Sequence, residues 1–169
     1  GMSARIRREG LTSPLAIEFS PALPLGSRLL TSQVAVSITA GDVHATLGMT
    51  MTAATAELRI PFEGGWSIVP PAMPAVIGRR SEAPRVLSER LGADGRYTIA
   101  LEGIAGRTYS FRLRAPSAPM ARAIKADVTA GVARLSDVPA NSRDRGLAVT
   151  FPAAGANADG YTAVTLSVR

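Results

Sequence analysis

The sequence predicts an all-β fold, namely an antiparallel β-sandwich of about eleven or twelve short strands. Short runs in which apolar and polar residues alternate recur along the chain, and turns rich in glycine and proline separate them. Helical periodicity is nearly absent, and the best helix candidate, residues 118–126, is short and alanine-rich. A composition of 46% hydrophobic and 19% charged residues is typical of a folded chain with a buried core.

Alternating runs in the first part of the chain predict a series of strands, each with one apolar face. They cover residues 15–19, 34–38, 43–51 and 56–62, and a further strand is predicted at 86–91. The last third adds strands at 124–128, 132–135, 147–151 and 161–168, the final two joined by the turn-rich "PAAGANADG".

Residues 95–116, "GRYTIALEGIAGRTYSFRLRAP", contain two alternating runs joined by "GIAGR". The glycine-bearing link predicts a turn, so the two runs predict a β-hairpin. We expect Arg112 and Arg114 to face outward. The inward-facing set is predicted to be Tyr97, Ile99, Leu101, Tyr109, Phe111 and Leu113.

The length of 169 residues favours one domain. We expect residues 1–13 to form an N-terminal tail, with Gly1 as a scar of tag removal, and residues 14–169 to form a single β-sandwich. Met2 is then the natural start, or the chain is a piece of a longer exported protein, which would place it in the periplasm or outside the cell. Neither a signal peptide nor a membrane span is recognised in the sequence.

The stretch 64–85, "GGWSIVPPAMPAVIGRRSEAPR", interrupts the rhythm of strands. Its prolines cannot donate hydrogen bonds to a central ladder, so we expect an irregular, proline-rich edge or a long surface loop. Long loops on rigid sandwiches are frequent sites of binding.

Composition excludes several classes of chemistry. No cysteine is present, which excludes disulfides, thiolate metal sites and a thiol nucleophile. The net charge of +6 rests on scattered arginines and one lysine, Lys125, without the interleaved aromatic residues of a nucleic-acid surface. No calcium loop, phosphate-binding glycine loop or multi-histidine cluster is recognised. We therefore expect no nucleic-acid partner, no membrane association, no metal and no cofactor.

A catalytic set of serine, histidine and carboxylate would have to use the only histidine, His44, in "GDVHATLGMTM". His44 is out of phase with Val43 and Ala45, which predicts a solvent-facing strand residue rather than a general base. No nucleophile elbow accompanies it, and the acidic residues are too dispersed to predict a pair for glycoside cleavage. The chain is therefore not expected to be an enzyme.

Two neighbouring residues in "FEGGWS", Glu63 and Trp66, are the candidate binding residues. A tryptophan can stack on the apolar face of a sugar ring, and Glu63 is the acid beside it. The alternative, which we favour, is that Trp66 is a core residue at the sandwich edge, held in place by a turn at Gly64 and Gly65.

Three phrases carry a resemblance: "AIEFSPALPLGSRL", "FEGGWSIVPP" and "RVLSERLGADGRYTIALEGIAGRTYSFRLRAP". Together they resemble the C-terminal β-sandwich region that follows the helical (α/α)6 catalytic barrel in some bacterial glycoside hydrolases, and "FSPALPLGSRL" is similar to the entry strand. The resemblance covers about residues 15–116. It rests on these short stretches of sequence and on the spacing of the predicted strands.

The resemblance implies a non-catalytic accessory or interaction module associated with a carbohydrate-active enzyme. Its partner would be a glycoside hydrolase catalytic domain or a glycan. The catalytic acids of such enzymes belong to the barrel, so no catalytic role is carried over to this chain. Two alternatives stay open, a carbohydrate-binding module that uses Trp66 and a free-standing interaction protein.

Overall fold

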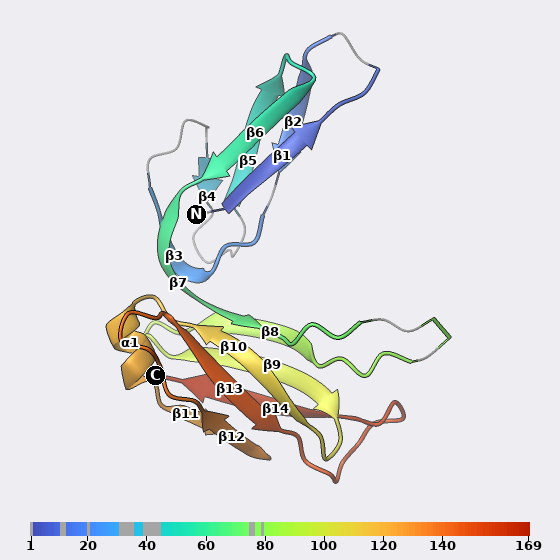
Figure 1. The fold of residues 1–169 in the computed structure, drawn as a ribbon, viewed down its shortest axis with the longest axis vertical. Coiled ribbons are helices and arrows are strands. Elements are labelled where there is room, and N and C mark those ends of the chain that lie inside the picture. Colours follow the sequence, from blue (N-terminus) through green and yellow to red (C-terminus); the bar gives the residue numbers. More distant parts are fainter. Residues whose placement is uncertain are drawn as a thin grey trace. The chain divides into compact units, whose positions relative to one another are not determined.

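The computed structural model describes residues 2–10, 13–19, 21–30, 36–38, 45–74, 77, 78 and 80–169. Within these residues the chain consists of antiparallel strands and one short helix, so the predicted all-β class is confirmed (Figure 1). The chain divides into two compact units, Gly1–Gly65 and Trp66–Arg169, where the sequence predicted a single domain. The boundary lies inside one strand, β7 (Phe62–Val69).

The first unit has its own small core. β1 (Met2–Arg7) pairs with β6 (Thr55–Ile60), with Met2 opposite Ile60 and Ala4 opposite Leu58. Leu58 and Ile60 are buried, and partly buried apolar residues pack against them: Met2, Ala4, Leu23, Leu29 and Phe62. Residues 2–7 are therefore a strand, which corrects the tail expected over residues 1–13. Alternate apolar residues of "MSARIR" supply one side of this core, although the intervening arginines and serine make the run polar on average.

A second sheet of the first unit has the order β2-β5-β4, with β2 at Leu15–Phe19, β5 at Ala45–Met51 and β4 at Val36–Ile38. Its pairs are antiparallel, and Leu15 lies opposite the buried Met51. β3 (Leu25–Leu29) lies beside β7 in another sheet. Alternation did not predict β3, because its glycine and two polar residues leave only two apolar positions in five, although β3 lies within the phrase that is similar to an entry strand.

The second unit is a β-sandwich. One sheet has the order β12-β13-β10-β7, formed by β12 (Val132–Leu135), β13 (Asp144–Thr150), β10 (Thr108–Arg114) and the part of β7 at Ser67–Val69. The other has the order β11-β14-β9-β8, formed by β11 (Ala126–Val128), β14 (Tyr161–Val168), β9 (Tyr97–Ile104) and β8 (Arg85–Leu91). Pairing is antiparallel in both sheets.

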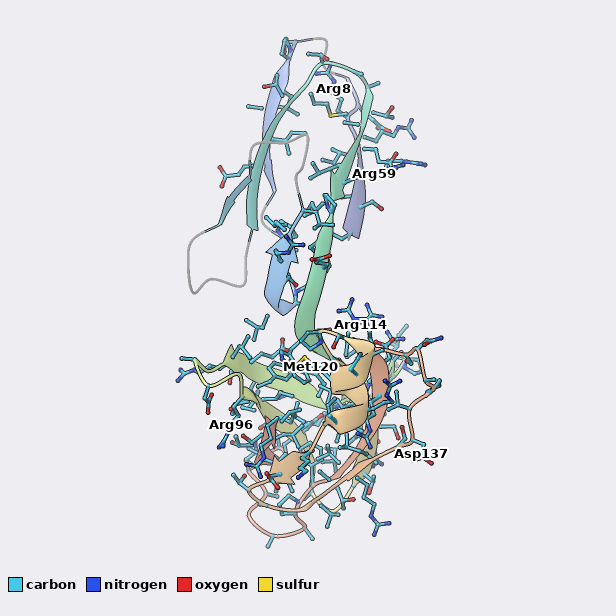
Figure 2. The ribbon with its side chains drawn as sticks, turned by 90° about the vertical axis from the view of Figure 1, so that its left-hand side faces the viewer. Arg8, Arg59, Arg96, Arg114, Met120 and Asp137 are labelled. Carbon is cyan, nitrogen blue, oxygen red and sulfur yellow. The ribbon has the colours of Figure 1, made fainter. Side chains whose placement is uncertain are left out.

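The core between the two sheets is formed by alternate residues of these strands. All six side chains predicted to face inward on β9 and β10 are at most 5% exposed, while Arg112 and Arg114 are exposed, so that prediction is confirmed. β13 and β14 contribute Leu147, Val149, Val164, Leu166 and Val168, and Phe151 follows β13. Figure 2 labels Arg96 and Arg114, two exposed residues of this unit.

The predicted hairpin between residues 97–101 and 109–113 is wrong. β9 pairs with β8 and β14, whereas β10 pairs with β7 and β13, so the two strands lie in different sheets. Residues 105–107 cross from one sheet to the other, and residues 151–160 do the same between β13 and β14. A period of two specifies which face of a strand is apolar, and that face is the same whether the next strand lies beside it or across the core.

The helix α1 (Ala118–Ala123) packs beside β13 and is capped at both ends. The Oγ of Ser117 accepts a hydrogen bond from the Met120 amide at 3.4 Å. At the other end, Nη1 of Arg145 donates to the carbonyls of Ala121 and Ile124, each at 3.2 Å. Figure 2 shows Met120 on this helix, where its side chain is 43% exposed.

Candidate functional site

Trp66 is a core residue of the second unit. It lies on β7, is 3% exposed, and stacks on Tyr97 of β9 with ring centroids 5.5 Å apart and planes 19° from parallel. The two rings come from the two opposed sheets, so their contact joins the layers of the sandwich. This confirms the interpretation of Trp66 as a core residue, since neither face of a ring so buried is open to a sugar.

Tyr97 also carries a polar group into the core. Its hydroxyl donates a hydrogen bond to the Glu89 carboxylate on β8, a strand that pairs with β9. Burial raises the pKa of Tyr97 above its ordinary value, and the neighbouring Glu89 raises it further. The phenol therefore stays protonated and acts as a donor, which is a structural role.

Glu63 belongs to the first unit and is exposed. Its carboxylate pairs with Arg28 of β3, whose Nε lies 2.9 Å from Oε1. Between Glu63 and Trp66, Gly64 and Gly65 have φ of +73° and +83°, a backbone region that favours glycine. A Cβ on Gly65 would lie 2.7 Å from the Cβ of Pro24, so this position requires glycine for space as well. The two candidate binding residues thus belong to different units, one an ion-pair partner and the other a core ring.

His44, the candidate general base, lies outside the described residues. Among the residues that the structure describes, no group of three or more histidine or carboxylate side chains is placed to hold a metal ion. The described helix is too short to cross a membrane.

The proline-rich stretch predicted as a loop at 64–85 is shorter in the structure, because residues 64–69 belong to β7 and Arg85 begins β8. Two buried tyrosines hold its end. The hydroxyl of Tyr109 donates to the Glu82 carbonyl at 2.8 Å, and that of Tyr161 donates to the Ser81 carbonyl at 2.7 Å. We call residues 81–85 the strap.

Further contacts fix the strap to the sandwich. Pro84 is buried, and the Arg85 guanidinium lies 4.5 Å from the centre of the Tyr161 ring. Glu82 pairs with Arg107. The sequence pattern predicted that Tyr109 is buried, but it did not predict that its hydroxyl bonds to the Glu82 carbonyl. The available signal was its residue type, because a buried tyrosine usually finds a hydrogen-bond partner for its hydroxyl.

The described residues between Val69 and Ile77 are all apolar and, except for Pro71, exposed. Val69 and Met73 are each 40% exposed and Ile77 is fully exposed, and Pro70 and Pro74 are also exposed. Figure 1 shows the segment between β7 and β8, in green, projecting from the body of the second unit. We call Val69–Pro74 together with Ile77 the proline-rich arm.

A hollow of ≈270 Å³ lies on the outer face of the sheet that contains β10, β13 and β12. Gly146, which lies opposite Arg112 on β10, forms the floor of the hollow because it has no side chain. The amide of Gly146 donates to Ser136 Oγ at 3.0 Å. The lining residues contain one charged group, Arg134, and no acid–base pair: Ser110, Arg134, Leu135, Ser136, Gly146, Leu147 and Ala148.

Aromatic side chains face inward throughout the part of the chain whose side chains are described. Phe62 is half-buried. The others are buried: Trp66, Tyr97, Tyr109, Phe111, Phe151 and Tyr161. None of these rings provides the exposed platform on which sugar-binding modules stack their ligands.

Comparison of this chain with protein-family models, with curated proteins and with solved structures finds no match.

Proposed function

We propose that this chain is a non-catalytic interaction module associated with a carbohydrate-active enzyme, contributing contact and orientation rather than chemistry. The observation that supports it best is the distribution of apolar side chains. The described aromatic rings are directed into the cores, whereas three of the eight large apolar side chains exposed in the described residues lie between 69 and 77. Exposed apolar side chains concentrated on a projecting segment are typical of a protein-binding surface.

The ion pairs of three carboxylates in the second unit also support a non-catalytic role. Glu82, Asp144 and Asp159 each form an ion pair with an arginine. Glycoside cleavage requires two acidic side chains that face each other across the substrate, whereas each of these carboxylates is paired with an arginine.

The link to a carbohydrate-active enzyme rests on the resemblance of residues 15–116 to sandwich regions of (α/α)6-barrel glycoside hydrolases. A module of this kind binds the catalytic barrel. A carbohydrate-binding module using Trp66 is the weaker proposal, because that ring is 3% exposed. A free-standing interaction protein would use the same surfaces with an unrelated partner.

Sedimentation velocity tests the proposal. The chain is mixed with the catalytic barrel of a bacterial (α/α)6 glycoside hydrolase. We expect a one-to-one complex and no hydrolysis of glycosides, esters or peptides by the chain alone. A purified chain whose glycosidase activity disappears with Glu63→Gln would overturn the proposal. Binding to oligosaccharides without binding to the barrel would favour the carbohydrate-binding alternative instead.

A further inference from the structure

We infer that the proline-rich arm is a docking segment that inserts into a groove of a partner protein lined by aromatic side chains. The inference rests on the proposed function and adds to it the surface and the kind of partner site. It is carried by three properties: the backbone of the arm is constrained, most of its side chains are exposed, and the chain is fixed to the sandwich at Val69 and again at the strap.

The sequence constrains the backbone of the arm. Pro70, Pro71 and Pro74 fix their own φ near the polyproline value, and Val69 and Met73 each precede a proline, which disfavours helical conformation. Residues 70–74 adopt no helix, strand or turn. A segment restricted in this way is already close to the polyproline II form, the conformation that aromatic-lined grooves recognise.

The exposed side chains of the arm suit such a groove. Polyproline II has three residues per turn, which places Pro70 in line with Met73 and Pro71 in line with Pro74. Pro70, Met73 and Pro74 are exposed, and Pro71 is half-buried. Proline rings and a flexible methionine are the apolar groups that pack on the faces of aromatic rings. Ile77, fully exposed, adds an apolar contact beyond this ridge.

The chain is anchored at one end of the arm and again at the strap, which lowers the entropy lost on binding. On one side Val69 is in register with Arg112 of β10. On the other side the strap is fixed by the hydroxyls of Tyr109 and Tyr161 and by the burial of Pro84. The arm therefore projects from a rigid base rather than from a free terminus.

The chemistry of the arm favours a protein groove over a membrane surface. A segment that enters the membrane interface usually combines tryptophan or tyrosine with lysine or arginine. The arm has neither aromatic nor charged residues, and Arg80, which follows it, pairs with Asp159. Prolines that keep the backbone extended also prevent the amphipathic helix that such surfaces bind.

Site-specific photo-crosslinking tests the inference. The full chain carries p-benzoylphenylalanine in place of Met73, or in place of Val132 as a control, because Val132 is an apolar residue of similar exposure (48%) on β12. Each chain is irradiated in a lysate of the cells that carry the gene, and the cross-linked peptides are sequenced. We expect position 73, and not position 132, to give an adduct on a peptide that contains aromatic residues. An excess of the synthetic peptide VPPAMPAVIG should suppress it.

A paired substitution tests the role of the prolines. Pro71→Ala with Pro74→Ala should reduce the adduct about tenfold, the loss expected when a central contact of an interface is removed. Since Pro74 is exposed and Pro71 half-buried, the fold should persist, and an unchanged Trp66 emission spectrum checks this. An adduct with a protein other than a carbohydrate-active enzyme would still support the inference about the arm, but it would overturn the proposed function.

Three results would overturn the inference itself. They are equal adducts from positions 73 and 132, an adduct that the peptide does not suppress, and an adduct that survives the two proline substitutions. Co-sedimentation with vesicles of phosphatidylcholine and phosphatidylglycerol that is lost with Ile77→Asp would also overturn it, in favour of a membrane surface.

Discussion

At the scale of single residues, Gly103 shows how closely the second unit is packed. A Cβ at this buried position would lie 2.6 Å from a ring carbon of Phe151. Gly103→Ala should therefore lower the free energy of unfolding by about 1–3 kcal/mol, as overpacked cores do. Urea denaturation measures this loss. Combining Gly103→Ala with Phe151→Leu should cost less than the sum of the two single changes, and simple additivity would show that the ring does not limit the site.

The ion pair between Arg114 and Asp144 gives a pH dependence of defined sign. Nε and Nη2 of Arg114 donate to the two carboxylate oxygens at 2.6 and 2.9 Å, and this lowers the pKa of Asp144. Because the folded pKa lies below the unfolded value, the stabilisation is present above about pH 4 and is lost as the pH falls through the folded pKa. The pair is partly exposed, so it contributes at most about 1 kcal/mol.

Asp144→Asn should accordingly flatten the slope of the free energy of unfolding against pH on the acid side, and leave that slope unchanged near neutrality. Urea denaturation over a series of acidic buffers measures it. An acid slope equal to that of the unmodified chain would mean that the carboxylate titrates alike in the folded and unfolded states.

At the scale of elements, the strap depends on two hydroxyl groups. Tyr161→Phe removes the hydrogen bond to Ser81 and should cost about 0.5–1.5 kcal/mol. The strap should then open more often, so trypsin should cleave after Arg80 faster. Tyr97→Phe is the matched control, because its hydroxyl contacts Glu89 and not the strap. Equal cleavage rates in Tyr161→Phe and the unmodified chain would show that the strap is held by other contacts.

Elements also show what sequence patterns can and cannot predict. Strong alternation identified β9 and β10 with their inward faces, and β14 as a strand, because burial on one face leaves a period of two. β1 was missed although Met2, Ala4 and Ile6 alternate with polar residues, because the run is polar on average. Alternation also does not specify the sheet to which each strand belongs. The partner of β9 depends on whether "GIAGR" turns within a sheet or crosses between sheets, and short glycine links serve both purposes.

Only part of the candidate site was predicted, because local patterns indicate which residues are buried and not which distant residues they contact. Trp66 was correctly interpreted as a core residue, since its flanking strand residues placed it at the sandwich edge. The strap was not foreseen, because its contacts join backbone carbonyls at 81–83 to tyrosines far along the chain. Such contacts leave no local periodicity, and only the fold brings the groups together.

At the scale of the whole molecule, two separate cores imply two unfolding transitions. Leu58 is a fully buried residue of the first unit, and Leu58→Ala should cost about 2–5 kcal/mol there. Trp66 fluorescence reports on the second unit alone, so its transition in urea should not move, while the transition seen by circular dichroism should broaden. Leu101→Ala, the matched change in the second unit, should shift the fluorescence transition. A shift of that transition by Leu58→Ala would show that the units unfold together.

Trp66 is part of the core that joins the two sheets and not a platform for sugars, and the proposed interaction module depends on this placement. Its emission, recorded on the full chain during titration with oligosaccharides and with an aqueous quencher, tests this most directly. A ring that is 3% exposed and stacked on Tyr97 should emit at short wavelength. Neither the quencher nor the oligosaccharides should change its emission until the sandwich unfolds. Long-wavelength emission that oligosaccharides change in the folded chain would contradict the account and make this residue a glycan-binding site.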